Sequence, residues 1–392
     1  MKILFSYTLL SLCALGCEVP QQAAPVITGA EQTEAYLDLL QQKRVGILTN
    51  HTAVIGETHL VDSLLSLGVD IQTIYAPEHG FRGAVGAGGY VGDDVDPTTG
   101  IPIVSLYRIR TMPTDSMMRE HDVMIYDIQD VGLRFYTYMT SMYYLMEACA
   151  RNNVPLIILD RPNPNGHYVD GPILDMELTT FAGIIPVPVV HGLTLGELAG
   201  MINGEKWLKD GLQCDVTVIK CKNYTHHTLY ELPVIPSPAL PNMRSIYLYP
   251  SLCLFEGTPI SMGRRTDFPF QVYGHPQMTD CDFNFTLQPR ENNPDQELPV
   301  YYGVDLRTEP SNKELFEEGL TVKYVIHAFQ NLNENIQIGE SFFRRYFDQL
   351  IGATYPREMI LAGKSAEEIK ECWKQDVENF KNQRAPYLLY PL

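Results

Sequence analysis

The feature that most constrains the fold is an alternation of short apolar runs with helical patterns, which begins at residue 44. The apolar runs include RVGILTN, IQTIYAPEHG, DVMIYDIQD and VPLIILDRP, and segments such as LVDSLLSLG and FYTYMTSMYYLMEACARNN between them have helical spacing. Strands that are apolar along their whole length are typical of sheets covered by helices on both faces. The pattern therefore predicts an α/β fold with a doubly wound, mostly parallel sheet.

Polar residues follow several of these predicted strands. In doubly wound sheets, ligands bind beyond the carboxyl ends of the strands. We therefore expect a binding site formed by the polar residues at these ends, which are Asn50, Glu78, His79, Asp127, Asp130, Asp160, Arg161 and, after a further extended run, His191. Any one of them could instead cap a helix or form a turn, so the argument depends on the whole set.

The pattern changes after residue 232. The segment LPVIPSPALPN is too rich in proline for a helix interior, and the next forty residues combine strand-like pieces with turns that carry Glu256 and Arg264. The last segment, SAEEIKECWKQDVENFKNQR, predicts an amphipathic helix capped by Ser365. We place the first domain at residues 44–248 and a smaller, mixed α+β domain at residues 249–392.

The N-terminus, MKILFSYTLLSLCALGC, has the features of an export signal. Lys2 precedes an apolar stretch, residues 3–15, that is too short to span a bilayer. The ending ALGC resembles a bacterial lipobox, which predicts a lipoprotein signal peptide over residues 1–17, a lipid on Cys17 and a tether over residues 18–43 that leads into the fold. The protein would then be an exported, membrane-anchored lipoprotein facing the periplasm or the cell surface; a plain secretory signal is the alternative.

The chain has a formal net charge of −18. Binding of nucleic acid requires a basic face, so this charge argues against nucleic acid as a partner. An anionic ligand would have to be bound by arginines placed close to it.

The sequence contains no motif for a metal or a cofactor. Its cysteines form no CxxC pair or zinc spacing, and pairing of Cys214 with Cys221 stays open. The glycine-rich stretch GAVGAGGYVG, residues 83–92, lacks the ending of a phosphate-binding loop and predicts a mobile loop beside the site. A serine-hydrolase elbow is also missing. We expect neither a metal nor a cofactor.

Carboxylates are therefore the candidate chemical groups. The best placed are Glu78, Asp127, Asp130, Asp160 and Glu256. Paired carboxylates in a cleft cleave glycosides, one as proton donor and the other as nucleophile, base or stabiliser.

Six ordered segments together resemble a known family. They are YAPEHGFRG, YDIQDVGLRFYTY, LDRPNPNG, VPVVHGLTLGELA, LYPSLCLFEGT and FKNQRAPYLLY. They are similar to the exo-β-N-acetylmuramidases of the NamZ type, a family earlier catalogued as a domain of unknown function. The resemblance implies a Rossmann-like N-terminal domain, a smaller C-terminal domain that closes the cleft, and release of N-acetylmuramic acid from the non-reducing end of peptidoglycan fragments.

The resemblance also implies roles for individual residues. The family's glutamates fall on Glu78, as the catalytic acid, and on Glu256, and its acidic strand-end motif places Asp127 beside them. The remaining residues would bind substrate, and they are Asn50, His79, Arg82, Asp130, Arg134, Tyr136, Asp160, Arg161, Asn163, His191 and Arg264. Of these, Arg82, Arg134 and Arg161 are the candidates for binding the lactyl carboxylate, because a guanidinium matches that anion.

The sequence departs from the family pattern at Arg108 and Arg265, where the family has glycines. These two differences affect the expected identity of the substrate more than the expected type of reaction. Retaining, inverting and substrate-assisted routes are all open. The alternative function is a lipoprotein without catalytic activity that captures muropeptides or sugars for uptake.

Overall fold

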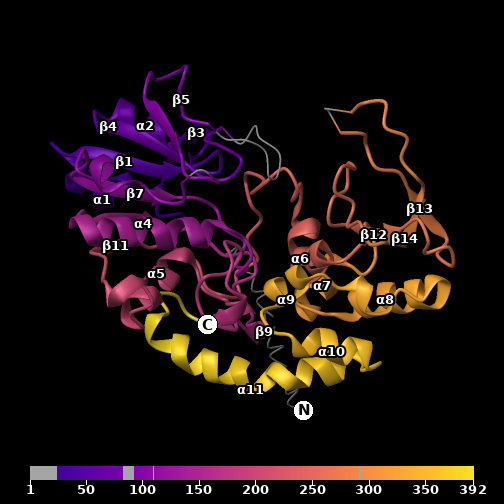
Figure 1. The fold of residues 1–392 in the computed structure, drawn as a ribbon. Coiled ribbons are helices and arrows are strands. Elements are labelled where there is room, and N and C mark those ends of the chain that lie inside the picture. Colours follow the sequence, from indigo (N-terminus) through magenta and orange to yellow (C-terminus); the bar gives the residue numbers. More distant parts are fainter. Residues whose placement is uncertain (1–23, 83–91, 109, 291–292) are drawn as a thin grey trace, which may run out of the picture.

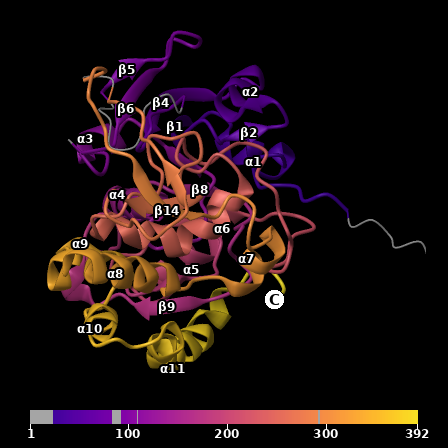
Figure 2. The same ribbon diagram turned by 90° about the vertical axis from the view of Figure 1, so that its right-hand side faces the viewer.

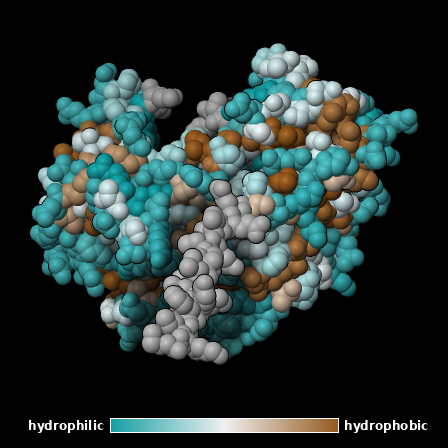
Figure 3. Space-filling model, turned by 180° about the vertical axis from the view of Figure 1, so that it is seen from behind, coloured by the Kyte–Doolittle hydropathy of each residue, from teal (hydrophilic) through white to brown (hydrophobic). Residues whose placement is uncertain are grey.

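The computed structural model describes residues 24–82, 92–108, 110–290 and 293–392. The predicted signal peptide, Cys17, and nearly all of the glycine-rich stretch lie outside the described residues. Two lobes stand side by side, and the C-terminal helix runs beneath both of them (Figure 1). Seen from behind, the surface is notched between the lobes (Figure 3).

A seven-stranded sheet forms the centre of the N-terminal domain. In spatial order its strands are β11 (Val216–Ile219), β8 (Leu156–Leu159), β7 (Val123–Asp127), β1 (Arg44–Thr49), β4 (Asp70–Ala76), β6 (Pro102–Ser105) and β5 (Asp94–Val95). All neighbours pair in parallel except β5, which pairs antiparallel with β6. The predicted doubly wound, mostly parallel sheet is confirmed.

Helices cover both faces of this sheet because successive strand residues point to opposite sides. On β7, Ile125 packs into one apolar core with α1 (Thr33–Leu40) and α2 (Leu60–Ser66). Its neighbours Met124 and Tyr126 pack into the other core, with α3 (Asp115–Met118), α4 (Tyr138–Asn152) and α5 (Leu195–Gly204). The carboxyl end of β4 leads into the cleft between the domains.

Four short strands of the N-terminal domain form two separate two-stranded sheets. The hairpin of β2 (Val54–Ile55) and β3 (Thr58–His59) precedes α2. The extended run before His191 forms β10 (Pro188–Val190), which pairs antiparallel with β9 (Asp170–Ile173) in a separate two-stranded sheet. His191 therefore does not follow a strand of the main sheet, contrary to the expectation from the sequence.

The C-terminal domain is a three-stranded antiparallel sheet packed with helices (Figure 2). The strands are β12 (Val272–His275), β14 (Tyr301–Asp305) and β13 (Phe283–Phe285). The α-helices are α6 (Met243–Leu252), α7 (Asn312–Glu318), α8 (Lys323–Ile336), α9 (Arg345–Ile351), α10 (Tyr355–Leu361) and α11 (Ala366–Arg384). The 3-10 turns of the chain are η1 (Met176–Leu178), η2 (Lys209–Gly211), η3 (Cys253–Gly257), η4 (Gly339–Phe342) and η5 (Ala385–Tyr387). The predicted smaller, mixed second domain is confirmed.

The C-terminal helix α11 ties the two domains together. Ser365 caps it in a capping box with Glu368, as the sequence predicts. Its last residue, Arg384, donates to the carbonyl oxygens of His191 and Gly192 in the N-terminal domain. The chain then crosses the N-terminal domain, so the C-terminal segment closes over the end of the main sheet.

The described part of the chain has no disulfide, and its six cysteines, Cys214 and Cys221 among them, are free thiols. No helix within the described ranges is both long enough and apolar enough to cross a membrane.

Candidate active site

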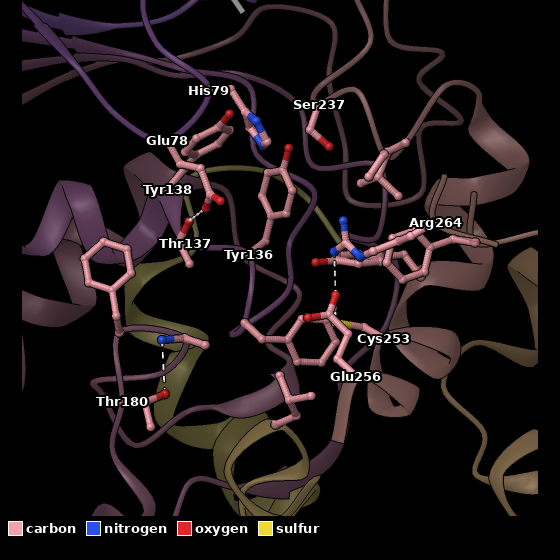
Figure 4. Close-up of a pocket in the computed structure, with 18 of the residues that line it drawn as sticks. Glu78, His79, Tyr136, Thr137, Tyr138, Thr180, Ser237, Cys253, Glu256 and Arg264 are labelled. Atoms are coloured by element: carbon pink, nitrogen blue, oxygen red, sulfur yellow. Dashed lines mark hydrogen bonds and ion pairs between the residues drawn. The ribbon is translucent and has the colours of Figure 1, made fainter. Parts of the chain in front are cut away.

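A cavity of about 490 Å³ lies between the two domains, beyond the carboxyl end of β4. Its walls come from the loop after β4, the start of α4, the proline-rich segment, α6, η3 and α9. Figure 4 shows Glu78 on one side of the pocket and Glu256 with Arg264 on the other, with Tyr136 between them. Two carboxylates from different domains therefore face one cavity.

Glu78 is placed by a turn that ends β4. Pro77 begins the turn, and His79 and Gly80 both adopt positive φ angles, of 72° and 77°. This conformation is unusual for a histidine, and such strain often accompanies a functional position. The turn directs Glu78 and His79 into the pocket, where His79 is only 6% exposed (Figure 4).

Both oxygens of the Glu78 carboxylate accept hydrogen bonds from hydroxyl groups. The Tyr107 hydroxyl donates to Oε1 at 2.8 Å, and the Thr137 hydroxyl donates to Oε2 at 3.3 Å. Tyr107 follows β6 and Thr137 precedes α4, so two further elements fix the orientation of this carboxylate.

Glu256 lies in η3, on the C-terminal side of the cavity. Its Oε1 is 2.5 Å from a guanidinium nitrogen of Arg264, whose guanidinium also lies 4.9 Å from the centre of the Phe270 ring. Burial acts to lower the pKa of Arg264, but the charge of Glu256 and its hydrogen bond together more than offset this effect, so that the pKa is raised. The Arg264 guanidinium therefore keeps its proton at neutral pH.

The cavity brings together only part of the predicted set. The predicted residues that line it are Glu78, His79, Tyr136, Glu256 and Arg264. The other predicted residues lie behind the site or beside it.

Asp127 is the predicted catalytic residue that the structure places elsewhere. Its carboxylate forms a two-pronged ion pair with Arg161, at 2.5 Å and 2.9 Å, and both side chains are almost fully buried. This pair fills the place at the carboxyl ends of β7 and β8 where a doubly wound sheet would bind a ligand. Neither residue lines the cavity, so their position supports the fold rather than substrate binding.

Arg134 is fully buried and acts as a clamp between the domains. Its guanidinium donates to the carbonyl oxygens of Pro172 at 2.9 Å, Val187 at 2.7 Å and Leu350 at 2.9 Å. Burial lowers its pKa to about 9. Leu350 belongs to α9 in the C-terminal domain, Pro172 to β9, and Val187 directly precedes β10. Arg134 therefore holds α9 against these segments of the N-terminal domain. It does not line the cavity, and the predicted role in binding the lactyl carboxylate does not fit its position.

Arg82, the third arginine proposed for the lactyl group, also points elsewhere. It pairs with Asp96 at 3.0 Å and lies 3.7 Å from Asp62. Asp96 is thus a buried partner of this arginine.

The remaining predicted residues are buried in polar networks behind the cavity. Asn50 accepts from Thr52, Asn163 bridges to Leu193, and Asp130 accepts from the amide of Gly132. Burial raises the pKa of Asp130 to about 7 and lowers that of His191 to about 3.

Asp160 supports the C-terminal segment. Its Oδ2 accepts from Tyr390 at 2.6 Å and from Thr194 at 2.7 Å. Burial raises the pKa of Asp160 to about 6, although these hydrogen bonds act to lower it. This strand end is therefore occupied by the protein's own C-terminal segment.

Sequence reasoning missed much of the aromatic lining. The aromatic side chains of the cavity are Tyr107, Phe135, Tyr136, Tyr138, Phe181, Tyr249, Phe270 and Tyr346. Thr137 and Tyr138 belong to the motif YDIQDVGLRFYTY, and Tyr107 directly follows a predicted strand. The sequence therefore contained a local indication that these three residues lie near the site. Phe181 and Tyr346 carry no local signal, because only the tertiary fold brings them to the cavity. No cluster of potential metal ligands occurs among the residues that the structure describes.

Opposed carboxylates in an aromatic cleft define a site of the glycoside-cleaving class. The family described as "Exo-beta-N-acetylmuramidase NamZ, N-terminal" matches residues 45–244, and its C-terminal counterpart matches residues 247–390. The chain belongs to the NamZ exo-β-N-acetylmuramidase family.

Individual relatives agree with this assignment. The chain is 35% identical over 379 residues to the peptidoglycan β-N-acetylmuramidase NamZ of Bacillus subtilis (strain 168), covering 91% of this chain and 89% of the relative. It is also similar to two crystal structures of DUF1343 family proteins from Bacteroides fragilis NCTC 9343. One is 53% identical with a TM-score of 0.86, covering 94% of this chain and 99% of the other. The second is 28% identical with a TM-score of 0.77, covering 93% and 99%.

Proposed function

We propose that this protein is an exo-β-N-acetylmuramidase that releases N-acetylmuramic acid from the non-reducing end of peptidoglycan fragments. The observation that carries the proposal is the placement of Glu78 and Glu256, from different domains, on opposite sides of one aromatic cavity. Family membership over both domains supports the same reaction. A small, pre-formed cavity lined by both aromatic and polar side chains suits the recognition of a single sugar unit.

The two carboxylates differ in their partners, which supports different roles. Glu256 is paired with Arg264, and we assign it to stabilise the positive charge that develops on the sugar ring in the transition state. Glu78 accepts from the neutral hydroxyls of Tyr107 and Thr137 and faces the cavity opposite Glu256, in position to deliver a proton. We assign Glu78 as the proton donor to the leaving oxygen.

Turnover of a chromogenic N-acetylmuramic acid glycoside tests this function directly. The proposal predicts release of the chromophore together with free N-acetylmuramic acid. Tight binding of the sugar without release would instead indicate the alternative, a lipoprotein that captures muropeptides or sugars for uptake.

Arg264 is our candidate for binding the lactyl carboxylate. Among the described residues that line the cavity, it is the one lysine or arginine side chain. Its side chain is about one-third exposed and lines the cavity. In a protein with a net charge of −18, an anionic substrate group requires such a local positive charge.

Arg264→Gln is expected to lower kcat/KM for an N-acetylmuramic acid glycoside more than for the matching N-acetylglucosamine glycoside. A hydrogen bond to a charged group contributes about 1.5–3 kcal/mol, so the ratio of the two values should fall by about 10- to 100-fold. Arg265→Gln is the matched control, because Arg265 is adjacent but binds the carbonyl of Gln288 outside the cavity. An unchanged ratio in Arg264→Gln would remove this residue from lactyl recognition.

We also propose that Cys17 carries a lipid that anchors the protein to a membrane. The support is the sequence ALGC at the end of a short apolar stretch. Cys17→Ser is expected to move the protein from the membrane fraction to the soluble fraction without changing its specific activity. Recovery of the unmodified wild type in the soluble fraction of its native host would contradict the anchor.

A further inference from the structure

The two hydroxyl donors to Glu78 are not part of the mechanism proposed above. Tyr107 and Thr137 approach the carboxylate from different elements, each on a different oxygen, at 2.8 Å and 3.3 Å. With both oxygens engaged, rotation of the carboxyl group is restricted. A proton donor needs such a fixed orientation, because proton transfer depends on reaching the leaving oxygen at hydrogen-bond distance.

Thr137 is used in an unusual way. It occupies the N-cap position of α4, where a threonine hydroxyl commonly accepts a hydrogen bond from a backbone amide of the first turn. Here the cap residue has helical angles, φ −68° and ψ −1°, and its side chain makes no capping bond. Its hydroxyl donates to Glu78 instead. The residue therefore serves the site and not the stability of the helix end.

Tyr107 is held by its surroundings as a hydrogen-bond donor. Its ring packs edge-on against Phe181, with ring centres 6.4 Å apart, and the Arg108 guanidinium lies 5.6 Å from its ring centre. Burial, followed by the charge of Glu78, raises the pKa of Tyr107. Its hydroxyl is therefore protonated at neutral pH and donates to the carboxylate.

We propose that Tyr107 and Thr137 form a hydroxyl clamp that positions Glu78 and sets how readily it takes up a proton. Both are positioning residues, since they act through Glu78, and the inference rests on the proposed function of Glu78 as proton donor. Donors to a carboxylate favour its charged form, so removal of a donor favours the protonated form.

Several other ionisable groups surround Glu78 and stay in place when the clamp is removed. They come from each element around it and are His79, Arg108, Tyr138, Tyr346 and the Glu256–Arg264 pair. Substitution of the clamp alone therefore isolates the effect of the two hydroxyls.

The pH dependence of kcat/KM in Tyr107→Phe and Thr137→Val tests the clamp. Each variant should move the alkaline limb upward by about one pH unit, since a lost hydrogen bond to a charged group and one unit of pKa are similar in size. The value of kcat at the optimum should fall by about tenfold, as expected for a displaced proton donor. Thr137→Ser, which keeps the hydroxyl, should restore both properties.

Two controls separate positioning from structure. Tyr144→Phe removes a tyrosine hydroxyl from a ring that also stacks on Phe181 but lies outside the cavity, and it should match the wild type. Thr137→Val should keep the wild-type Tm, because no capping bond is lost.

The outcomes distinguish the clamp from the proposed function. Suppose that Glu78→Gln is inactive but that Tyr107→Phe and Thr137→Val have the same pH profile as the control Tyr144→Phe. The hydroxyl clamp would then be wrong, and the proposed function would stand. If Glu78→Gln keeps wild-type activity, Glu78 is not the proton donor, and the clamp fails together with that assigned role. A shift of the acidic limb in place of the alkaline one would support the clamp and overturn the role of Glu78 as acid.

Discussion

Glu78→Gln is expected to fold like the wild type and to lose roughly 10²–10⁴-fold of its turnover, the usual contribution of general acid catalysis. The amide has nearly the same shape, and its one oxygen still accepts from one of the two hydroxyls, but it has no acidic proton to deliver to the leaving oxygen. The measurement is kcat on an N-acetylmuramic acid glycoside, with Tm recorded on the same preparation.

Glu57→Gln provides the control for this prediction. Glu57 is exposed in the turn between β2 and β3 and does not line the cavity, so its variant should keep wild-type rates. Near-wild-type turnover by Glu78→Gln would exclude Glu78 from the mechanism. The sequence would suggest Asp127 as the proton donor instead, but its carboxylate forms a buried ion pair with Arg161. Glu256 would therefore become the next candidate for the proton donor.

Arg134→Ala is expected to lower the free energy of unfolding by about 3 kcal/mol or more. The substitution removes the donor from three buried carbonyl oxygens, and each unsatisfied group typically costs about 1–3 kcal/mol. It also leaves a cavity where the side chain was fully buried. Denaturant unfolding followed by circular dichroism gives this free energy.

The substrate preference of the Arg134 variant is as informative as its stability. Because Arg134 does not line the cavity, the remaining folded protein should keep the wild-type ratio of activity on muramic acid and glucosamine glycosides. Arg119→Ala, at an exposed arginine, should change stability by no more than about 0.5 kcal/mol. If Arg134→Ala instead kept wild-type stability but lost its preference for the muramic acid glycoside over the glucosamine glycoside, Arg134 would be a substrate-binding residue.

The main sheet could be predicted because its signal is local. Each strand is an apolar run such as Val123–Asp127, and each helix between the strands has its own spacing. The cap of α11 at Ser365 was predictable for the same reason, since Ser365 and Glu368 have the spacing of a capping box. The sequence did not reveal that the run before His191 pairs with β9, because pairing depends on contacts between distant segments.

The candidate site could be predicted only in part. Glu78 and Glu256 stand in recognisable motifs, and both face the cavity. Arg134 and Asp160 also stand in recognisable motifs, but neither lines the cavity. Arg134 joins the two domains, and Asp160 accepts a hydrogen bond from Tyr390. A charged residue at a strand end can bind a ligand or the chain itself, and only the packing of the second domain decides between these uses.

His226 illustrates the same difficulty. The sequence around it gives no sign of burial, but its side chain is 2% exposed and lies 3.0 Å from Glu197. Glu197 in turn caps α5 and accepts from the amide of Leu389. A return of the C-terminal segment to the first domain creates this buried pair, and no local pattern indicates it.

The most direct test of the central claim compares two disaccharides that differ only in the order of their sugars. We predict that the disaccharide with N-acetylmuramic acid at its non-reducing end is split into monosaccharides, because its lactyl carboxylate reaches the arginine of the cavity. With N-acetylglucosamine outermost, the substrate has no lactyl carboxylate to meet that arginine, so the disaccharide should be inert. Equal turnover of the two disaccharides, or cleavage of long glycan chains at internal bonds, would contradict the account.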